Sequence, residues 1–234
     1  MGQRSQIYVR FNKENGQKGL IANYYGWNFG ERMISRARWG IECIKEHFEY
    51  ISNPSYRWLN VKRNEIYLSR IFDTNFDMCD VAISCNIIKE LLDLYNVSID
   101  SKWVKSDLDE ALKKENLDET TASEVFKDYI FMNQDNNDGK LFVDIQDDGI
   151  KYCFLDSTSN TDNIMDAAAY MVWNHQNCKE PDWTKDEYIT PEQKEKCCKN
   201  IIAINKMATL MTKEEIEDFI NYDYLGDTEQ LPLF

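Results

Sequence analysis

The chain has 234 residues and a net charge of −14, with 43% hydrophobic and 13% aromatic residues. This composition excludes a disordered chain and supplies enough apolar side chains for one large domain or two small ones. No apolar run approaches the ~20 residues that cross a bilayer, so we expect no membrane-spanning segment.

The charge is divided unevenly along the chain. Residues 1–70 contain all eight arginines and four lysines against six glutamates, a net charge of +6, whereas residues 71–234 carry −20. Arginine binds phosphate and carboxylate groups through paired hydrogen bonds, so an anion site is expected in the first third. The acidic remainder disfavours general nucleic-acid binding and suits either a basic partner surface or a solvated face.

Cysteine usage indicates the compartment. The seven cysteines are an odd number at irregular spacing, and no signal peptide precedes them. Both observations predict reduced thiols and a cytoplasmic protein.

The first elements form a β-hairpin. Residues 5–11 alternate between apolar and polar side chains, which predicts a half-buried strand. Asn15-Gly16 separates this segment from a second apolar run, Gly19–Tyr25, and is a strong hairpin-turn signal. Tyr8 and Arg10 share one face of the first strand. We expect this face to lie near the following helix.

A long amphipathic helix is predicted next, within Tyr24–Ile51. Asn28, with Glu31 three residues later, matches an N-cap and capping box. Apolar residues then recur every three or four positions and form one buried face. These are Ile34, Ala37, Ile41, Ile44, Phe48 and Ile51.

A second stripe of this helix carries arginines near its positive end. Arg32 and Arg36 oppose the helix dipole there unless an anion or carboxylate neutralises them. Gly30 would allow a phosphate to approach the free N–H groups closely. Internal pairing of the arginines with acidic side chains is the alternative. The expected anion site comprises Tyr8, Arg10, Gly30, Arg32, Arg36 and Trp39.

The middle of the chain gives weaker signals. A short helix is predicted over Lys62–Phe72, a brief strand over Asp80–Ser84, and a helix over Asn86–Tyr95 with one apolar stripe. Residues 97–122 are acidic and polar, which favours surface loops and short helices.

Three short apolar segments follow, at Tyr129–Met132, Lys140–Ile145 and Lys151–Leu155. Turn residues at 137–139 and 147–149 separate them, so we expect a small antiparallel meander. The first turn partly resembles an EF-hand loop, but an isoleucine occupies its glutamate position, which favours a hairpin turn instead.

The last third is predicted to be helical. One helix is expected over Asp162–His175. A second begins after Thr190, where Pro191 takes the first helical position, and runs to about Met211. Thr212 and the glutamate three residues later start a third helix, which ends near residue 222.

No catalytic constellation is evident. His47 and His175 are the only histidines, and neither accompanies a recognisable nucleophile motif. No P-loop or dinucleotide fingerprint is present. No metal-ligand spacing is present either, because the adjacent Cys197-Cys198 pair cannot easily bind one ion. We therefore expect no enzymatic activity, no cofactor and no metal.

The final residues carry a short linear motif. Gln230-Leu231-Pro232-Leu233-Phe234 resembles the bacterial sliding-clamp-binding motif, commonly glutamine, leucine, serine or aspartate, leucine and phenylalanine, and matches it at four of five positions. In such a motif the glutamine makes polar contacts at the mouth of a cleft that the apolar side chains fill. A tail that folds back onto its own domain is the alternative.

A second resemblance concerns the N-terminal block. GQRSQIYVRF and YYGWNFGERMISRAR resemble an uncharacterised family of proteins from phages and prophages of low-GC Gram-positive bacteria. This resemblance implies the cytoplasm of a bacterial host cell as the setting and implies no mechanism.

Together these signals predict an α+β fold with an N-terminal β-hairpin, a long amphipathic helix, a small antiparallel meander and a helical C-terminal third. Residues 1–224 should form one domain, with a soft division near residue 100, and 225–234 a flexible tail. The expected function is non-catalytic binding to the host sliding clamp through the tail and to a nucleotide or phosphate through the arginine helix. The alternative is an anti-defence protein that blocks a host nuclease or sequesters a nucleotide signal.

Overall fold

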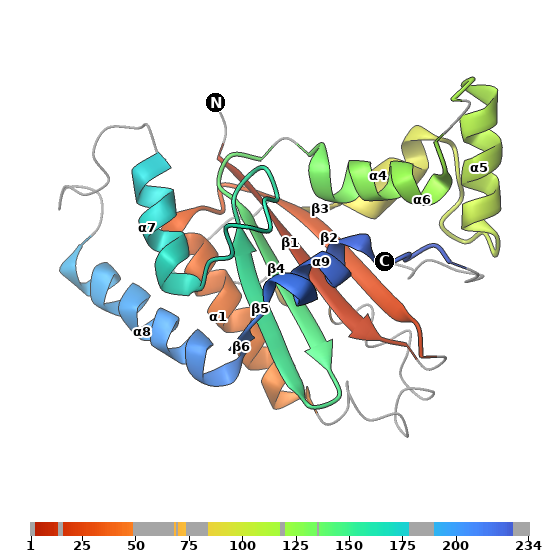
Figure 1. The fold of residues 1–234 in the computed structure, drawn as a ribbon. Coiled ribbons are helices and arrows are strands. Elements are labelled where there is room, and N and C mark those ends of the chain that lie inside the picture. The colour runs from red at the N-terminus through yellow and green to blue at the C-terminus, as the bar shows by residue number, and fades with distance from the viewer. Residues whose placement is uncertain are drawn as a thin grey trace.

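A computed structural model describes residues 3–13, 16–48, 68, 70–73, 84–117, 120–134, 136–177 and 190–226. Its strands are β1 (Arg4–Asn12), β2 (Lys18–Gly26), β3 (Ser84–Asn86), β4 (Lys140–Gln146), β5 (Gly149–Leu155) and β6 (Thr209–Leu210). They form one mixed sheet in the order β3-β2-β1-β4-β5-β6 (Figure 1).

The predicted N-terminal hairpin is confirmed. β1 and β2 pair antiparallel from Arg4 opposite Gly26 to Asn12 opposite Lys18. Gly16, at the turn, has φ +83°, a backbone conformation that glycine adopts without strain. The alternation of residues 5–11 therefore sends successive side chains to opposite faces of the sheet.

Seven α-helices and a π-helix accompany the sheet in the described part of the chain. They are α1 (Gly30–Glu46), α4 (Ile87–Leu94), α5 (Val104–Lys114), α6 (Ala122–Lys127), the π-helix η1 (Asp128–Met132), α7 (Ala167–Asn177), α8 (Pro191–Met207) and α9 (Lys213–Asn221). The described helices include none with the length and hydrophobicity of a membrane span.

The predicted buried face of α1 is confirmed over the length of the helix, but its predicted cap is wrong. Ile34, Ala37, Ile41 and Ile44 are all fully buried, Phe48 is partly buried after the end of the helix, and Ile51 lies outside the described residues. The helix begins at Gly30, and no side chain caps its first N–H groups. Asn28 is turned inward, where it bonds to other buried side chains instead.

The predicted meander is also corrected. β4 and β5 form its last two strands, paired antiparallel, but Asp128–Met132 is a π-helix rather than a strand. Residues 137–139 therefore connect this helix to β4 and do not form a hairpin turn. On its other edge, β4 pairs in parallel with β1, from Gln6 opposite Lys140 to Phe11 opposite Ile145.

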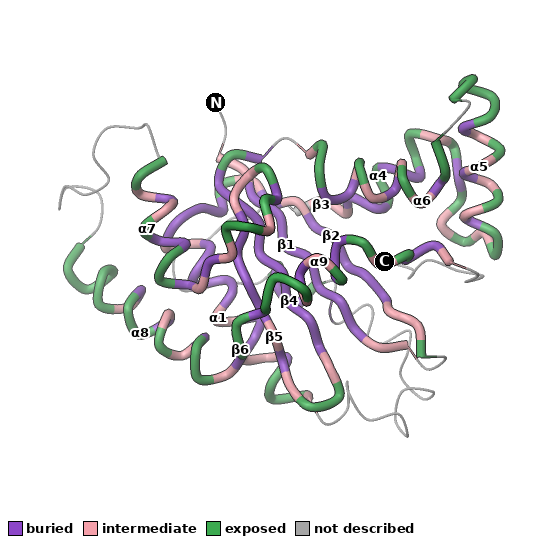
Figure 2. Tube along the Cα trace, in the orientation of Figure 1, coloured by how far each residue is buried: buried purple, intermediate pink, exposed green. Residues whose placement is uncertain are grey.

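Two hydrophobic clusters lie on opposite faces of the sheet, whose strands are largely buried (Figure 2). Helices α1, α7 and α8 cover one face, on which the side chains of Ile7, Val9 and Phe11 lie. Helices α4, α5, α6 and α9 and the π-helix contribute to the other cluster, together with Tyr8 and Phe142. The result is three layers, with most of the sheet buried on both sides.

The C-terminal helices follow their capping signals. Thr190 and Gln193 form a capping box at α8, and Thr212 and Glu215 form one at α9. α8 ends at Met207, earlier than predicted, because the next residues pair with β5 as β6.

Two other predicted elements need qualification. α7 begins five residues later than expected, at Ala167. Most of the predicted helix Lys62–Phe72 and strand Asp80–Ser84 lies outside the described residues. The predicted helix Asn86–Tyr95 is confirmed as α4, and Asn86 caps it by accepting from the Lys89 N–H.

Candidate functional site

The structure does not bring the six residues of the predicted anion site together. Tyr8 and Arg10 lie on the face of the sheet opposite α1, so the expectation that they approach this helix is wrong. The pattern of β1 assigned these two residues to one face correctly, but the helix packs on the other.

Arg10 is occupied by carboxylates. Its guanidinium donates to Asp144 from Nε (3.0 Å) and Nη2 (2.6 Å) and to Asp218 from Nη1 (2.7 Å). It also lies 4.7 Å above the ring of Phe219. Arg10 is 2% exposed, so it holds α9 on the sheet rather than presenting a charge to a ligand.

Arg36 is likewise structural. It is fully buried, donates from Nε to Asn28 Oδ1 over 3.0 Å and from Nη1 to the Phe72 carbonyl, and lies 4.9 Å above the Tyr25 ring. Asn28 also donates to Ser5 Oγ over 2.8 Å. These contacts explain why Asn28 does not cap α1.

The N-terminus of α1 is covered by α7. Gly30 has φ +49°, and a Cβ atom there would lie 3.1 Å from Asn174 Oδ1. His175 Nε2 lies 3.3 Å from Glu31 Oε1, and this contact raises the pKa of His175. Asn174 and this ion pair thus occupy the approach that a phosphate would need.

Arg32 is the predicted arginine that remains nearest the surface. It is partly exposed, lies 5.3 Å above the Phe29 ring and donates to the Trp27 carbonyl over 3.3 Å. Trp27 is 55% exposed and has φ +59°. Trp39, further along α1, is also partly exposed.

A buried polar cluster that the sequence analysis did not identify lies beneath the π-helix. Its members come from β1, the segment before β4, β4 itself and the turn after β5, and all are less than a tenth exposed. They are Gln6, Tyr8, Asn136, Lys140 and Ser159. One available signal was the alternation in β4, which puts Lys140 on the same face as Phe142.

Lys140 and Ser159 bind the end of the π-helix. Lys140 Nζ donates to the Phe131 carbonyl (2.6 Å) and to Ser159 Oγ, which donates in turn to Phe131 O over 2.8 Å. Burial lowers the pKa of Lys140 to about 8, partly opposed by Asp156. A lysine beside a serine hydroxyl can activate a nucleophile, but Ser159 is 6% exposed and its hydroxyl is directed to a backbone carbonyl.

Asp138 ties the same end of the sheet to α7. Its carboxylate accepts from the Arg4 N–H over 2.7 Å, and Tyr170 donates to its carbonyl over 2.8 Å. Burial raises the pKa of Asp138 to about 6, against the hydrogen bonds from Arg4 and Asn174.

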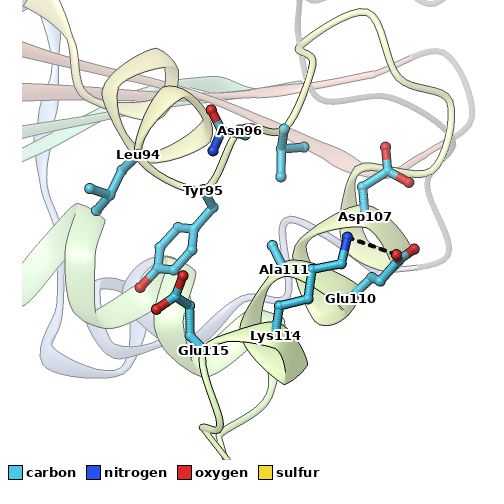
Figure 3. Close-up of a pocket in the computed structure, with 9 residues that line it drawn as sticks. Leu94, Tyr95, Asn96, Asp107, Glu110, Ala111, Lys114 and Glu115 are labelled. Atoms are coloured by element: carbon cyan, nitrogen blue, oxygen red, sulfur yellow. Dashed lines mark ion pairs between the residues drawn. The ribbon is translucent and has the colours of Figure 1, made fainter.

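A surface hollow of about 320 Å³ lies between the end of α4 and α5 (Figure 3). It is lined by Leu94, Tyr95, Asn96, Val97, Asp107, Glu110, Ala111, Lys114 and Glu115. Lys114 and Glu110 lie one turn apart on α5, and Lys114 Nζ is 2.9 Å from Glu110 Oε1. None of the residues of the predicted anion site lines this hollow.

The predicted clamp-binding residues Gln230, Leu231, Pro232, Leu233 and Phe234 lie outside the described residues. The last described residue is Gly226, and the two residues before it are buried: Tyr224 is 3% and Leu225 is 2% exposed. The Tyr224 hydroxyl donates to the Phe219 carbonyl over 2.8 Å. The chain is therefore fixed to the domain close to the point where the motif begins.

Comparison with protein families, curated proteins and solved structures finds no match to this chain. The described residues contain no group of three histidine, cysteine or acidic side chains placed to hold a metal ion.

Proposed function

We propose that the protein is a non-catalytic binding protein of a phage or mobile element that binds the host sliding clamp through Gln230–Phe234. The observation that carries this proposal is the match of the segment to four of the five positions of the clamp-binding motif. The buried anchor at Tyr224 and Leu225 supports it, because the motif follows five residues after a fixed point. Any partner held there would stay close to α9.

The chemistry of the segment suits a short recognition motif. Two leucines and a phenylalanine supply apolar anchors for a cleft, and the glutamine supplies donors and an acceptor at its mouth. Ordering a short peptide on binding offsets part of the contact energy, so affinity on the order of micromolar is expected.

A peptide of the last ten residues, titrated into purified bacterial sliding clamp by calorimetry, tests the proposal. Phe234→Ala and Leu233→Ala should each weaken binding by about 1–3 kcal/mol, because each removes an apolar anchor. Pro232→Ser is the matched control and should bind as well or better. Failure of the wild-type peptide to bind at high micromolar concentration would refute the clamp proposal.

We further propose that an anionic ligand contacts Arg32. The observation that favours this residue over the other predicted arginines is its partial exposure, since it lies next to the backbone carbonyl of the exposed Trp27, whereas Arg10 and Arg36 are buried among protein partners. A guanidinium suits a phosphate group, because it donates two parallel hydrogen bonds to the phosphate oxygens.

Thermal melting with ATP and with inorganic phosphate tests this second proposal. Either ligand should raise the melting temperature of the wild-type protein and not that of Arg32→Gln. Arg38→Gln is the control, since Arg38 already pairs with Glu42 at 2.6 Å. A ligand shift that survives Arg32→Gln would exclude Arg32 as the contact.

A further inference from the structure

Two carboxamide side chains of the buried polar cluster meet between β1 and the segment that enters β4. Gln6 is 0% and Asn136 8% exposed, and Asn136 Nδ2 donates to Gln6 Oε1 over 3.1 Å. Gln6 Nε2 and Asn136 Oδ1 find no hydrogen-bond partner among the described residues, and both atoms are closed to solvent. Buried polar atoms are nearly always bonded, so this pair requires an explanation.

Tyr8 limits how the two amides can be oriented. Its hydroxyl oxygen lies 2.6 Å from the Ile130 carbonyl and 2.8 Å from Gln6 Oε1, but a phenol has one hydrogen to donate. When that hydrogen goes to Ile130, Gln6 presents its amino group to the Tyr8 oxygen. Asn136 must then present its carbonyl to Gln6. This exchange of amide oxygen and nitrogen needs almost no movement of heavy atoms.

Both self-consistent orientations of the two amides leave one hydrogen-bond donor and one acceptor without a partner. In the first, Gln6 has an unused N–H and Asn136 an unused carbonyl oxygen; in the second, Gln6 has the unused oxygen and Asn136 the unused N–H. Turning only one amide would set two donors or two acceptors against each other. The site therefore always offers one donor and one acceptor, on two side chains that are bonded to each other.

We propose that Gln6 and Asn136 bind one buried water molecule, which accepts a hydrogen bond from one amide and donates one to the other. A neutral guest is required because a cation would meet the N–H group and an anion would meet the carbonyl oxygen. Water combines a donor and an acceptor in the smallest volume and is the usual partner of buried amides. It would fasten the connection from the π-helix to the start of β1.

The water should be visible by NMR on the full-length ¹⁵N-labelled protein. Water-to-amide cross-peaks at the side-chain NH₂ groups of Gln6 and Asn136 should have opposite signs in laboratory-frame and rotating-frame experiments, which marks a long-lived bound molecule. The NH₂ group of Asn137, the exposed neighbour, is the internal control and should show only fast surface hydration. Gln6 and Asn136 signals that match Asn137, or no cross-peaks at all, would overturn the proposal.

A variant separates this site from any other nearby water. Asn136→Leu removes one of the two partners, so the long-lived cross-peak at Gln6 should disappear while the backbone signals of β4 stay dispersed. Persistence of that cross-peak would show that the water is held by other groups and would overturn the assignment. If Asn136→Leu does not fold, the wild-type spectra alone decide between the two outcomes.

Discussion

At the scale of single residues, three of the described cationic side chains are buried, and each contacts a different kind of partner. Arg10 is neutralised by carboxylates, Arg36 binds uncharged carbonyl oxygens and an aromatic ring, and Lys140 binds a carbonyl and a hydroxyl. The ammonium of Lys140 thus has no directly bonded carboxylate among the described residues. Burial therefore dominates, and the pKa of Lys140 falls to about 8.

This lowered pKa predicts an unusual dependence of stability on pH. Between pH 8 and 10.5, the unfolded chain binds more protons at Lys140 than the folded protein does, so the free energy of unfolding rises with pH over that window. The rise attributable to Lys140 should be on the order of 3 kcal/mol. Urea unfolding at pH 7.5, 9 and 10.5 measures it as the difference between wild type and Lys140→Met.

Lys199→Met is the control for that experiment, because Lys199 is exposed and forms an exposed ion pair with Glu195 one helical turn away. Its stability should follow the wild type at every pH. A wild-type curve parallel to that of Lys140→Met would show that Lys140 does not titrate in this range.

The composition of the predicted anion site failed for a physical reason. Local alternation places Tyr8 and Arg10 on one face of β1, but which face receives α1 depends on contacts distant in sequence. Burial of Arg36 likewise depends on the Phe72 carbonyl, 36 residues away. A stripe of arginines on a helix therefore predicts that these residues lie on the same side of the helix. It does not predict whether that side faces solvent or the protein interior.

At the scale of elements, several short-range signals predicted the structure correctly, although the cap signal at Asn28 and Glu31 did not, and long-range strand pairing could not be predicted. The hairpin follows from a two-residue turn signal between two apolar runs, and the caps of α8 and α9 follow from motifs of four residues; all three are confirmed. The apolar run 129–132 is too short to distinguish a strand from a helix, and the structure makes it a π-helix. The parallel pairing of β1 with β4 joins segments about 130 residues apart and leaves no local trace.

The docking of α9 gives a matched pair of substitutions. Asp144 is 1% exposed and accepts two bonds from Arg10, whereas the side chain of Asp218 is 65% exposed and accepts one. Asp144→Asn should cost about 3–5 kcal/mol because it leaves a buried guanidinium poorly compensated. Asp218→Asn should cost about 1 kcal/mol or less.

Chemical denaturation of both variants tests this ranking. Equal losses of stability would mean that the exposed carboxylate contributes as much as the buried one, contrary to the geometry of the pair.

At the scale of the whole molecule, the fold brings the basic and acidic parts of the sequence together. Arg10, from the basic first third, is held by Asp144 and Asp218 of the acidic remainder. Conversely, Glu31, an acidic residue of the basic first third, contacts His175 of the acidic remainder. Part of the arginine excess that suggested an external anion is therefore used inside the protein.

The anchor before the motif yields a prediction about two truncations. Removing residues 227–234 should leave the melting temperature within about two degrees, because a tail that binds a partner adds little to the core. Removing residues 224–234 also deletes the buried Tyr224 and Leu225, which should cost at least about 3 kcal/mol. For a chain of this length that loss corresponds to about 6 °C or more. Calorimetry of the two truncated proteins beside the full-length chain measures both changes in melting temperature. A large fall in melting temperature on removing residues 227–234 would show that the tail docks on its own domain. The motif would then have to leave that surface before it could bind a clamp.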